Sequence, residues 1–288
     1  MRAHQTIGVI GGSGFYEMEG LTEVKELSLD TPFGAPSGPF VVGQLGERRL
    51  VFLSRHGQGH RLSPSEINYR ANVWGMKKLG VEWLLSVSAV GSLREHIRPG
   101  DLVVIDQCID RTHRRASTFF TDGVVGHVSM ADPVCGHLAG HLADAARRVA
   151  PNIVHQGGTY VCIEGPQFSS RAESHLYRSW NADVIGMTNM PEAKLAREAC
   201  LCYATLALST DYDCWHVSEE AVTVDLVLAV MKKNIAAAQA TVRELAAHVP
   251  LERTCPCRNA LRGAVISDMR HLTDEQKERL ELFLSETR

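Results

Sequence analysis

Two carboxylates separated by one residue, Asp211 and Asp213, follow an apolar run and are candidates for proton-transfer chemistry. A buried carboxyl group beside an anionic ligand has a raised pKa, because apolar surroundings and a nearby negative charge both disfavour ionisation. Such a group can protonate a leaving group. A single aspartate in a polar stretch is more often a solvated loop carboxylate, so these residues need support from others.

A second group of residues suits a small anion such as phosphate. Arg55 and His56 follow an apolar run and offer a guanidinium fork and an imidazole. Ser88 and Ser92 bracket a flexible turn and add hydroxyl groups. Each feature has a structural alternative, since the first could be a surface salt-bridging pair and the second an ordinary turn.

The glycine-rich segment Gly11-Gly12-Ser13-Gly14 could also bind an oxyanion through backbone N–H groups and the Ser13 hydroxyl. A nicotinamide-cofactor fingerprint is the competing interpretation. The stretch from Gly12 to Glu17 lacks its third glycine, which would let the helix pack closely on the strand. A tight strand-to-helix turn is the structural alternative.

These residues need elements that bring them together, and the chain has a repeating pattern of short apolar runs. They are typical of strands buried on both faces, and they span Thr6–Ile10, Arg49–Ser54, Trp83–Val87, Leu102–Ile105, Thr159–Ile163, Asp183–Ile185 and Tyr203–Leu208. Helix-start signals lie at Ser63, Ser170, Ser218 and Thr273. Strands alternating with helices predict a single α/β domain, with a twisted, mostly parallel or mixed sheet flanked by helices.

Polar clusters follow six of these proposed strands. In open α/β sheets the ligand crevice lies at the carboxyl ends of the strands, so six clusters in this position predict one assembled site. They begin at Gly11, Arg55, Ser88, Glu164, Met187 and Thr210. We expect residues 1–248 to form this domain and residues 249–288 to form a C-terminal appendage.

Composition favours small-molecule chemistry. The 288 residues are 44% hydrophobic and 22% charged, and the formal net charge is -3. That balance gives no electrostatic reason to bind nucleic acid or an anionic membrane. The N-terminus lacks the apolar run of a signal peptide, and no later segment is apolar for eighteen residues, so we expect a cytoplasmic protein.

The eight cysteines are too scattered for a disulfide scaffold. Four of them, Cys108, Cys162, Cys200 and Cys202, lie in apolar runs, where a thiol packs as a small hydrophobe. Neither Cys200-Leu201-Cys202 nor Cys255-Pro256-Cys257 has the usual two-residue spacing of zinc ligands, so the sequence predicts no metal.

Several of these segments together resemble the trimeric purine nucleoside phosphorylases, and within them most closely the enzymes that act on 5'-methylthioadenosine. The likeness runs in order from about Ile7 to Leu245. It is carried by Gly11-Gly12-Ser13-Gly14, Asp30-Thr31-Pro32-Phe33-Gly34, Arg55-His56-Gly57, Asn68-Tyr69-Arg70-Ala71-Asn72, Gly91-Ser92-Leu93-Arg94 and the string from Glu164 to Glu173. The last string is far more selective than a glycine motif.

The resemblance implies phosphorolysis of an adenine nucleoside in a homotrimer or a pair of trimers, with sites at subunit interfaces. No cofactor is expected, because inorganic phosphate is a co-substrate. Carried over by position, phosphate would lie among Ser13, Arg55, His56, Ser88, Ala89 and Thr188. The ribose and purine would meet Phe168, Gly186, Met187 and Thr210.

In this family pattern Asp211 engages the purine N7 and protonates the departing base. Asp213 would accept a hydrogen bond from the exocyclic amino group of adenine. Members selective for 6-oxopurines resemble one another in having Asn at the Asp211 position, so the presence of both aspartates favours adenine. On the 5' side, Val224 and Val227 could form an apolar wall, and His127 could come from the neighbouring subunit. Helix packing explains the valines equally well, and a lone histidine is more often structural.

Two positions depart from the pattern of the animal enzymes. Gly186 replaces a polar residue, which could remove contacts to the base or ribose and admit adenosine. The Cys255-Pro256-Cys257 segment resembles a Cys-X-Cys of some heat-stable microbial members, where it is associated with disulfide redox chemistry, although a reduced pair is expected in the cytosol.

Two alternatives to this function remain open. One is a phosphorylase of the same fold that prefers adenosine or methylthioinosine, and the other is a non-catalytic nucleoside-binding protein.

Overall fold

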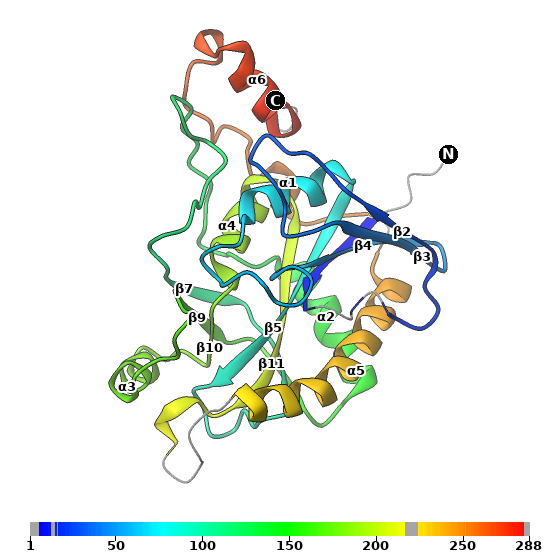
Figure 1. Ribbon diagram of the computed structural model, residues 1–288, viewed down its shortest axis with the longest axis vertical. Coiled ribbons are helices and arrows are strands. Elements are labelled where there is room, and N and C mark those ends of the chain that lie inside the picture. The colour runs from blue at the N-terminus through cyan, green and yellow to red at the C-terminus, as the bar shows by residue number, and fades with distance from the viewer. Residues whose placement is uncertain (1–5, 13–14, 16, 217–223, 251, 285–288) are drawn as a thin grey trace.

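The computed structural model describes residues 6–12, 15, 17–216, 224–250 and 252–284, and the side chains of residues 224–229, 231, 269 and 284 lie outside that description. The described strands form one eleven-stranded mixed sheet. Helices α1 and α4 pack against each other on one side of the sheet, and α2 and α5 do so on the other (Figure 1). This confirms the predicted α/β domain with a mixed sheet.

All seven predicted strands are present, because each is buried and rich in β-branched or aliphatic residues. They are β1 (Thr6–Gly11), β4 (Arg48–Ser54), β5 (Val81–Ser92), β6 (Leu102–Val104), β9 (Thr159–Ile163), β10 (Val184–Gly186) and β11 (Cys202–Asp211). Every residue of β1 and β11 is buried. A strand covered on both faces carries a continuous apolar run that is visible in the sequence.

Four further strands were not predicted. They are β2 (Thr22–Leu27), β3 (Phe40–Leu45), β7 (Gln107–Arg111) and β8 (Val154–Gln156). Strand β2 is almost fully exposed, β8 is only three residues long, and β7 has no buried residue. Strands β2, β7 and β8 therefore depend on pairing with a neighbour and leave little apolar pattern in the sequence, whereas β3 begins with the apolar run Phe40-Val41-Val42.

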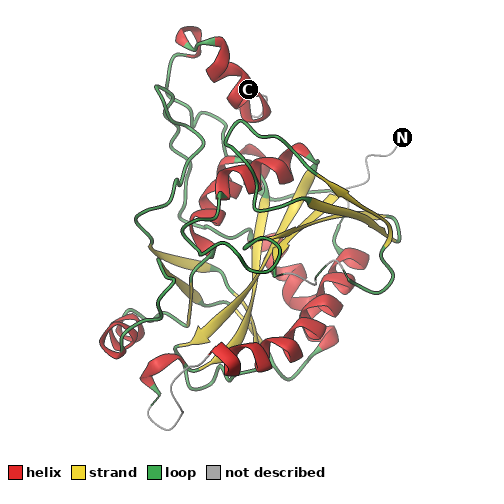
Figure 2. Cartoon of the chain, viewed as in Figure 1, coloured by secondary structure: helices red, strands yellow, loops and turns green. Residues whose placement is uncertain are grey.

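Strand pairing brings four of the six predicted polar clusters to one edge of the sheet, whereas the clusters after β9 and β10 follow strands that run the other way. Strand β1 pairs in parallel with β4 and with β5, and β5 pairs in parallel with β11. Strand β10 runs antiparallel to the end of β5. The carboxyl ends of β1, β4, β5 and β11 therefore face the same way, with the start of α4 beyond β10 (Figures 1 and 2).

The helices are α1 (Tyr69–Lys78), α2 (Gly136–Val149), α3 (Arg171–Ser179), α4 (Asn189–Glu198), α5 (Val224–His248) and α6 (Asp274–Leu284). The capping boxes predicted at Ser170 and Thr273 are confirmed at α3 and α6. The helix start predicted at Ser63 is wrong, because Glu66 only closes a local turn with Ser63. The N-cap is Asn68, whose side chain accepts from the Ala71 amide. The predicted start at Ser218 lies outside the described residues.

The C-terminal segment packs on an extended loop of the main body. The rings of Phe283 and Phe119 have centroids 4.4 Å apart, and Gly126 forms a β-bridge with Val265. Helix α6 and the loop lie side by side at one end of the molecule (Figure 1). None of the helices in the described part of the chain combines the length and apolar character that a bilayer crossing requires.

Candidate active site

Asp211 ends β11 directly beside Gly91 of β5. A β-carbon on Gly91 would lie 3.0 Å from Oδ1 of Asp211 and 3.3 Å from Cβ of Asp213. Only a glycine leaves both aspartates this close to the β5 backbone. The two carboxylates predicted from their spacing therefore lie together over the end of β5.

Asp211 is buried and hydrogen-bonded through both oxygens. Its Oδ1 accepts from the Asp213 amide at 2.8 Å, and its Oδ2 lies 2.6 Å from the Thr210 hydroxyl, which is also 3.2 Å from the Val90 carbonyl. Burial raises the pKa of Asp211, although hydrogen bonds from Thr210 and Asp213 oppose the shift. Thr210 can donate to ionised Asp211, or accept from its protonated form while donating to Val90. Both protonation states are therefore accommodated.

Asp213 is buried with one oxygen unused. Its Oδ2 has no hydrogen-bond partner within the described residues, and burial raises the pKa of its carboxyl group. Its backbone φ of 53° lies in the left-handed region, a strained conformation for a residue with a β-carbon. Burial of an unpartnered oxygen costs about 1–3 kcal/mol unless a ligand supplies a donor. Asp213 is thus arranged as a hydrogen-bond acceptor for a ligand.

Three hydroxyl groups form a second cluster further back along β5. Ser88 Oγ lies 3.3 Å from Thr188 Oγ1 and 3.3 Å from the hydroxyl oxygen of Tyr160. All three residues are buried, and Thr188 is the N-cap of α4 without using its side chain to cap the helix. Hydroxyl groups that converge in this way can donate to an anion. Ala89, next to Ser88, is half-buried on β5.

Arg55 forms a buried ion pair with Glu192. Its Nε and Nη2 donate to the two carboxylate oxygens at 2.8 and 3.1 Å, and Nη2 also contacts Ser86 Oγ at 2.7 Å. Nη1 donates to the Val87 carbonyl. The two-pronged phosphate contact expected of Arg55 is not available here, because Glu192 occupies that edge of the guanidinium. The surface salt-bridge alternative is also wrong, since both side chains are buried.

His56 is held in one tautomer. Its Nδ1 lies 2.8 Å from the Leu62 carbonyl, which can only accept, so Nδ1 carries the hydrogen. Burial lowers the pKa of His56 to about 4, and the Arg55 charge acts in the same direction. Above that pH the ring is neutral and offers Nε2 as an acceptor. Such a nitrogen can receive a hydrogen bond from the O–H group of monoprotonated phosphate.

A loop after β9 lies beside the aspartates. The thiol of Cys214 contacts the Ser169 carbonyl at 3.3 Å, and Arg171 Nε contacts the Cys214 carbonyl at 3.3 Å. Phe168 in this loop is 54% exposed. An aromatic ring so exposed next to a polar site can stack on a flat ligand.

Arg115 connects this loop to the start of α4 and was not identified from the sequence. Its Nη2 donates to the Glu164 carbonyl at 2.6 Å, while its Nη1 donates to the carbonyls of Met187 and Met190, each at 2.6 Å. Met187 also packs against Gly165, where a β-carbon would lie 2.5 Å from its sulfur atom. Arg115 thereby positions Met187. Nothing in the local sequence distinguishes Arg115 from its neighbour Arg114.

Gly186 has a structural reason to lack a side chain. A β-carbon there would lie 1.9 Å from the hydroxyl oxygen of Tyr160 and 2.6 Å from the ring carbon that bears it. The expected loss of polar contacts at this position is therefore offset, because the Tyr160 hydroxyl takes the place of the missing side chain. Tyr160 was not predicted as a site residue. A glycine ending a buried strand was the available signal, since it marks a close approach.

The remaining predicted residues are not part of these clusters. His127 is exposed, and its amide donates to the Ala264 carbonyl of the C-terminal segment. Val224 and Val227 begin α5, but their side chains lie outside the described residues, as does Ser13. Gly11 ends β1, and its carbonyl accepts from the Arg55 amide. The glycine segment thus starts beside Arg55.

The two clusters lie at the two ends of one short stretch of β5. Ser88 marks the hydroxyl cluster and Gly91 the aspartates, and three residues of strand span about 10 Å. One end supplies hydroxyl groups that can donate to an anion. The other supplies carboxyl groups with raised pKa values for a hydrogen-bond donor or a basic ring. The geometry suits a ligand or ligand pair with a phosphate end and a flat heteroaromatic end.

Comparison with known proteins agrees with this geometry. The phosphorylase superfamily model matches residues 6–247. The S-methyl-5'-thioadenosine phosphorylase of Geobacter sulfurreducens is 58% identical over 281 residues, covering 97% of this chain and 98% of its own.

Solved structures give the same result. A methylthioadenosine phosphorylase from an Antarctic soil metagenomic library has a TM-score of 0.93 and 49% identity, covering 97% of this chain and 99% of its own. The methylthioadenosine phosphorylase of Schistosoma mansoni in complex with adenine has a TM-score of 0.82 and 36% identity, covering 98% of each chain. The similarity therefore extends over the C-terminal segment as well.

Proposed function

The chain belongs to the phosphorylase superfamily, and from that premise we propose that it cleaves 5'-methylthioadenosine with inorganic phosphate. The products are adenine and 5-methylthioribose-1-phosphate. In this role the protein is a pentosyltransferase of purine and methionine salvage. It needs no cofactor, since phosphate is a co-substrate.

One observation carries this proposal: the aspartates and the hydroxyl cluster lie about 10 Å apart along β5, as the two ends of a nucleoside–phosphate pair require. A non-catalytic nucleoside-binding protein has use for the aspartate end only. The hydroxyl cluster at the start of α4 has a purpose when phosphate reacts with the nucleoside.

We assign the phosphate to the hydroxyl end of the site. Ser88 and Thr188 donate to its oxygens, with Ser13 and the backbone at Ala89 completing the cradle. Arg55 contributes the remaining hydrogen of Nη1, because Nε and Nη2 are bound to Glu192 and the other Nη1 hydrogen donates to the Val87 carbonyl. The neutral His56 accepts the proton of monoprotonated phosphate at Nε2.

We assign the nucleoside to the aspartate end. Phe168 stacks on the purine, and Met187 contacts the ribose, with Thr210 and the backbone of Gly186 nearby. Asp213 Oδ2, which lacks a donor, accepts from the exocyclic amino group of adenine. A 6-oxopurine would instead direct oxygen lone pairs at this carboxylate, so the arrangement favours adenine.

The reaction breaks the bond between the ribose C1' and the purine N9 and forms a bond between C1' and a phosphate oxygen. Positive charge develops on the ribose and negative charge on the base, so the phosphate stabilises one and Asp211 protonates the other at N7. His56 takes up the proton that phosphate loses. The base thus gains one proton and the phosphate loses one, and solvent exchange restores both residues.

We further propose that the active enzyme is a cytoplasmic homotrimer or a pair of trimers. His127 is held by the C-terminal segment and not by the site, which fits a contribution to the neighbouring subunit's 5' pocket. Exposed apolar side chains at Val125 and Ile266 lie in the same region and suit an interface. Val224 and Val227 form the apolar wall of the 5' pocket in this proposal. Light scattering of the purified protein measures the subunit number.

Labelled inorganic phosphate tests the proposed reaction. The protein is incubated with 5'-methylthioadenosine and labelled phosphate, and the sugar product is isolated. Phosphorolysis transfers the label to the sugar in the same amount as adenine is released. Adenine without label in the sugar indicates hydrolysis, and bound nucleoside without products indicates the binding protein.

A further inference from the structure

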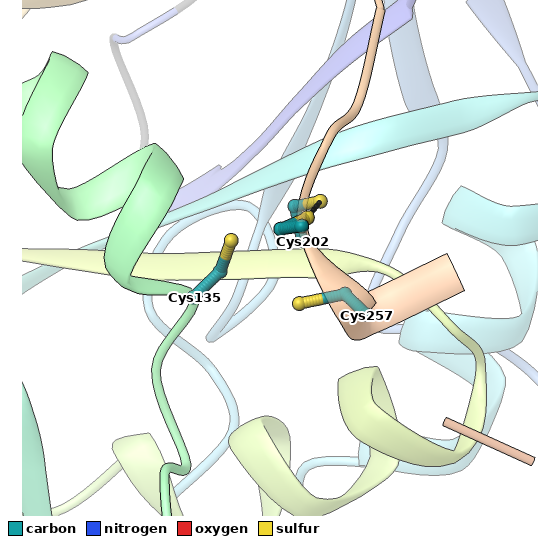
Figure 3. A group of neighbouring side chains, drawn as sticks. Cys135, Cys202 and Cys257 are labelled. Atoms are coloured by element: carbon teal, nitrogen blue, oxygen red, sulfur yellow. Dashed lines mark hydrogen bonds between the residues drawn. The ribbon is translucent and has the colours of Figure 1, made fainter. Parts of the chain in front are cut away.

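Four cysteine thiols from distant parts of the sequence meet in one place. Cys135 is the N-cap of α2, Cys202 begins β11, and Cys255 and Cys257 flank a proline in the C-terminal segment. Their sulfur atoms all lie within 4.8 Å of one another. The labelled side chains of Cys135, Cys202 and Cys257 converge in Figure 3. Cys255 is half-buried and the other three are buried.

The arrangement has the size of a tetrahedral metal site. Four points within 4.8 Å of one another fit inside a sphere of about 2.9 Å radius, and a zinc–sulfur bond is about 2.3 Å long. Each sulfur is thus within a small side-chain adjustment of bonding distance to a common centre. Chain spacing hid this site, because only Cys255 and Cys257 are close in sequence.

Groups that stabilise negative charge surround the sulfur atoms. The Leu138 amide donates to Cys135 Sγ at 3.5 Å, and Arg197 Nη1 donates to Cys257 Sγ at 3.6 Å. Arg253 Nη1 donates to the Cys200 carbonyl at 2.8 Å, two residues before Cys202, while Arg253 Nη2 pairs with Glu82 at 3.4 Å. Donors of this kind are typical of the outer shell of a metal–thiolate centre.

Two disulfides explain these features less well. The sulfur atoms of Cys202 and Cys255 are 3.2 Å apart, well beyond the bond length of about 2.05 Å. Two disulfides require two close pairs and not four mutually close thiols. A neutral disulfide also has no need of an amide and a guanidinium group that donate to its sulfur atoms, whereas thiolates are stabilised by them.

We propose that Cys135, Cys202, Cys255 and Cys257 bind one Zn²⁺ ion as a structural tetrathiolate site. Binding to four protonated thiols forms four zinc–sulfur bonds and releases four protons to solvent. The centre has a net charge of -2, which Arg197 offsets in part through its contact with Cys257. Soft sulfur ligands in a tetrahedral arrangement select zinc over magnesium or calcium.

The site fastens the C-terminal segment to the body of the protein. Cys202 and Asp211 lie at opposite ends of β11, about 30 Å apart for a ten-residue strand, so the metal takes no part in the reaction. The start of α2 and the start of β11 are already joined, because the Cys135 amide donates to the Tyr203 carbonyl. The zinc ion would attach to these two elements the C-terminal segment that carries Cys255 and Cys257. Its role is therefore structural.

Metal analysis of the full-length protein, purified under reducing conditions without added chelator, tests the proposal. We expect one zinc per chain by mass spectrometry. Replacement by Co²⁺ should give the near-ultraviolet charge-transfer bands of a cobalt–thiolate centre. A thiol-blocking reagent should release the zinc in proportion to the cysteines modified.

Variants locate the site. Cys255→Ser should weaken zinc binding by more than about a hundredfold, since loss of an outer-shell partner alone costs 10–100-fold. Cys255→His, which supplies another zinc ligand, should retain the ion. Cys108→Ser is the matched control, because Cys108 is half-buried outside the cluster, and its zinc content should equal that of the parent.

The folded parent protein decides the outcome even if a variant misfolds. A parent protein that holds no zinc after this purification would overturn the proposal. Bound iron in place of zinc, or unchanged zinc in Cys255→Ser, would also overturn it.

Discussion

The hydroxyl oxygen of Tyr160 occupies the place of a side chain at Gly186, where a β-carbon would lie only 1.9 Å from it. The same hydroxyl lies 3.3 Å from Ser88 Oγ and 3.5 Å from the Thr188 amide. The large Tyr160 side chain on β9 therefore requires a glycine at position 186 on the neighbouring strand β10. This pairing places the Tyr160 hydroxyl at the proposed phosphate end of the site, which neither residue predicts from the sequence alone.

Tyr160→Phe should weaken the use of phosphate. The Tyr160 hydroxyl contacts Ser88 and Thr188, the two residues proposed to bind phosphate. Its loss should remove about 1 kcal/mol of transition-state stabilisation, which lowers kcat/KM for phosphate roughly fivefold. The KM for nucleoside should change less. Steady-state kinetics with varied phosphate measures the effect, and a thermal melt checks the fold. Identical phosphate kinetics in parent and variant would contradict the role.

Asp211→Ala should lose most turnover. Removal of a general acid lowers kcat by about 10²–10⁴-fold. Loss of the hydrogen bonds to Thr210 and the Asp213 amide adds a small decrease in stability. Single-turnover release of adenine measures the chemical step directly. A variant with normal turnover would remove Asp211 from the mechanism.

Asp211 also predicts the acid–base behaviour of the reaction. Burial raises its pKa, and the protonated form is the active one, so kcat/KM should fall as pH rises through that raised value. His56 imposes the acid limit, because its pKa is about 4 and it must be neutral to accept a proton. A pH–rate profile with no decrease on the alkaline side would argue against a protonated Asp211.

Asp213→Asn should shift preference toward 6-oxopurine nucleosides. An amide can donate to a carbonyl oxygen, whereas the carboxylate of the parent only accepts. A hydrogen bond to a charged group is worth about 1.5–3 kcal/mol, so the ratio of kcat/KM for adenine and hypoxanthine nucleosides should change by about 10–100-fold. The ratio within one preparation controls for enzyme concentration. An unchanged ratio would mean that Asp213 does not select the base.

Glu198 should make stability depend on pH. Burial raises its pKa from 4.5 to about 7, against the hydrogen bonds from Phe119 and Thr118. The folded protein then holds the proton more tightly than the unfolded chain, so this contribution is complete below about pH 4.5. It is lost as pH rises through 7, by about 3 kcal/mol.

Chemical denaturation between pH 4.5 and 8 checks this prediction. Glu198→Gln cannot ionise and should lack this component of the pH dependence. If parent and variant show parallel stability curves over that range, Glu198 does not have a raised pKa in the folded protein.

The sequence predicted the parts of the fold that depend on local pattern. Strands such as β9 and β11 carry continuous apolar runs because both of their faces are covered. Strand β2 is exposed and exists through its pairing with β3, so no local pattern marked it. The helix expected from Ser63 begins at Tyr69, because a turn closed by Ser63 and Glu66 uses the same residue types as a capping box.

The meeting of parallel strand ends at one edge of the sheet predicted part of the proposed site, but it did not apply to the clusters after β9 and β10, which run opposite to β5. It correctly predicted that Asp211, at the end of β11, lies near Ser88 on the neighbouring strand β5. The Arg55–Glu192 pair joins residues 137 positions apart, and the four-thiol cluster joins three segments. Such contacts depend on tertiary packing, which local spacing does not encode.

Steady-state release of free base is the most direct test of the proposed function. The protein is supplied in turn with 5'-methylthioadenosine, adenosine, methylthioinosine and inosine, each with and without inorganic phosphate. We predict phosphate-dependent release of adenine, fastest from 5'-methylthioadenosine. Faster release from inosine or methylthioinosine would contradict the assignment of Asp213, and the absence of phosphate-dependent release from all four would contradict the proposed function.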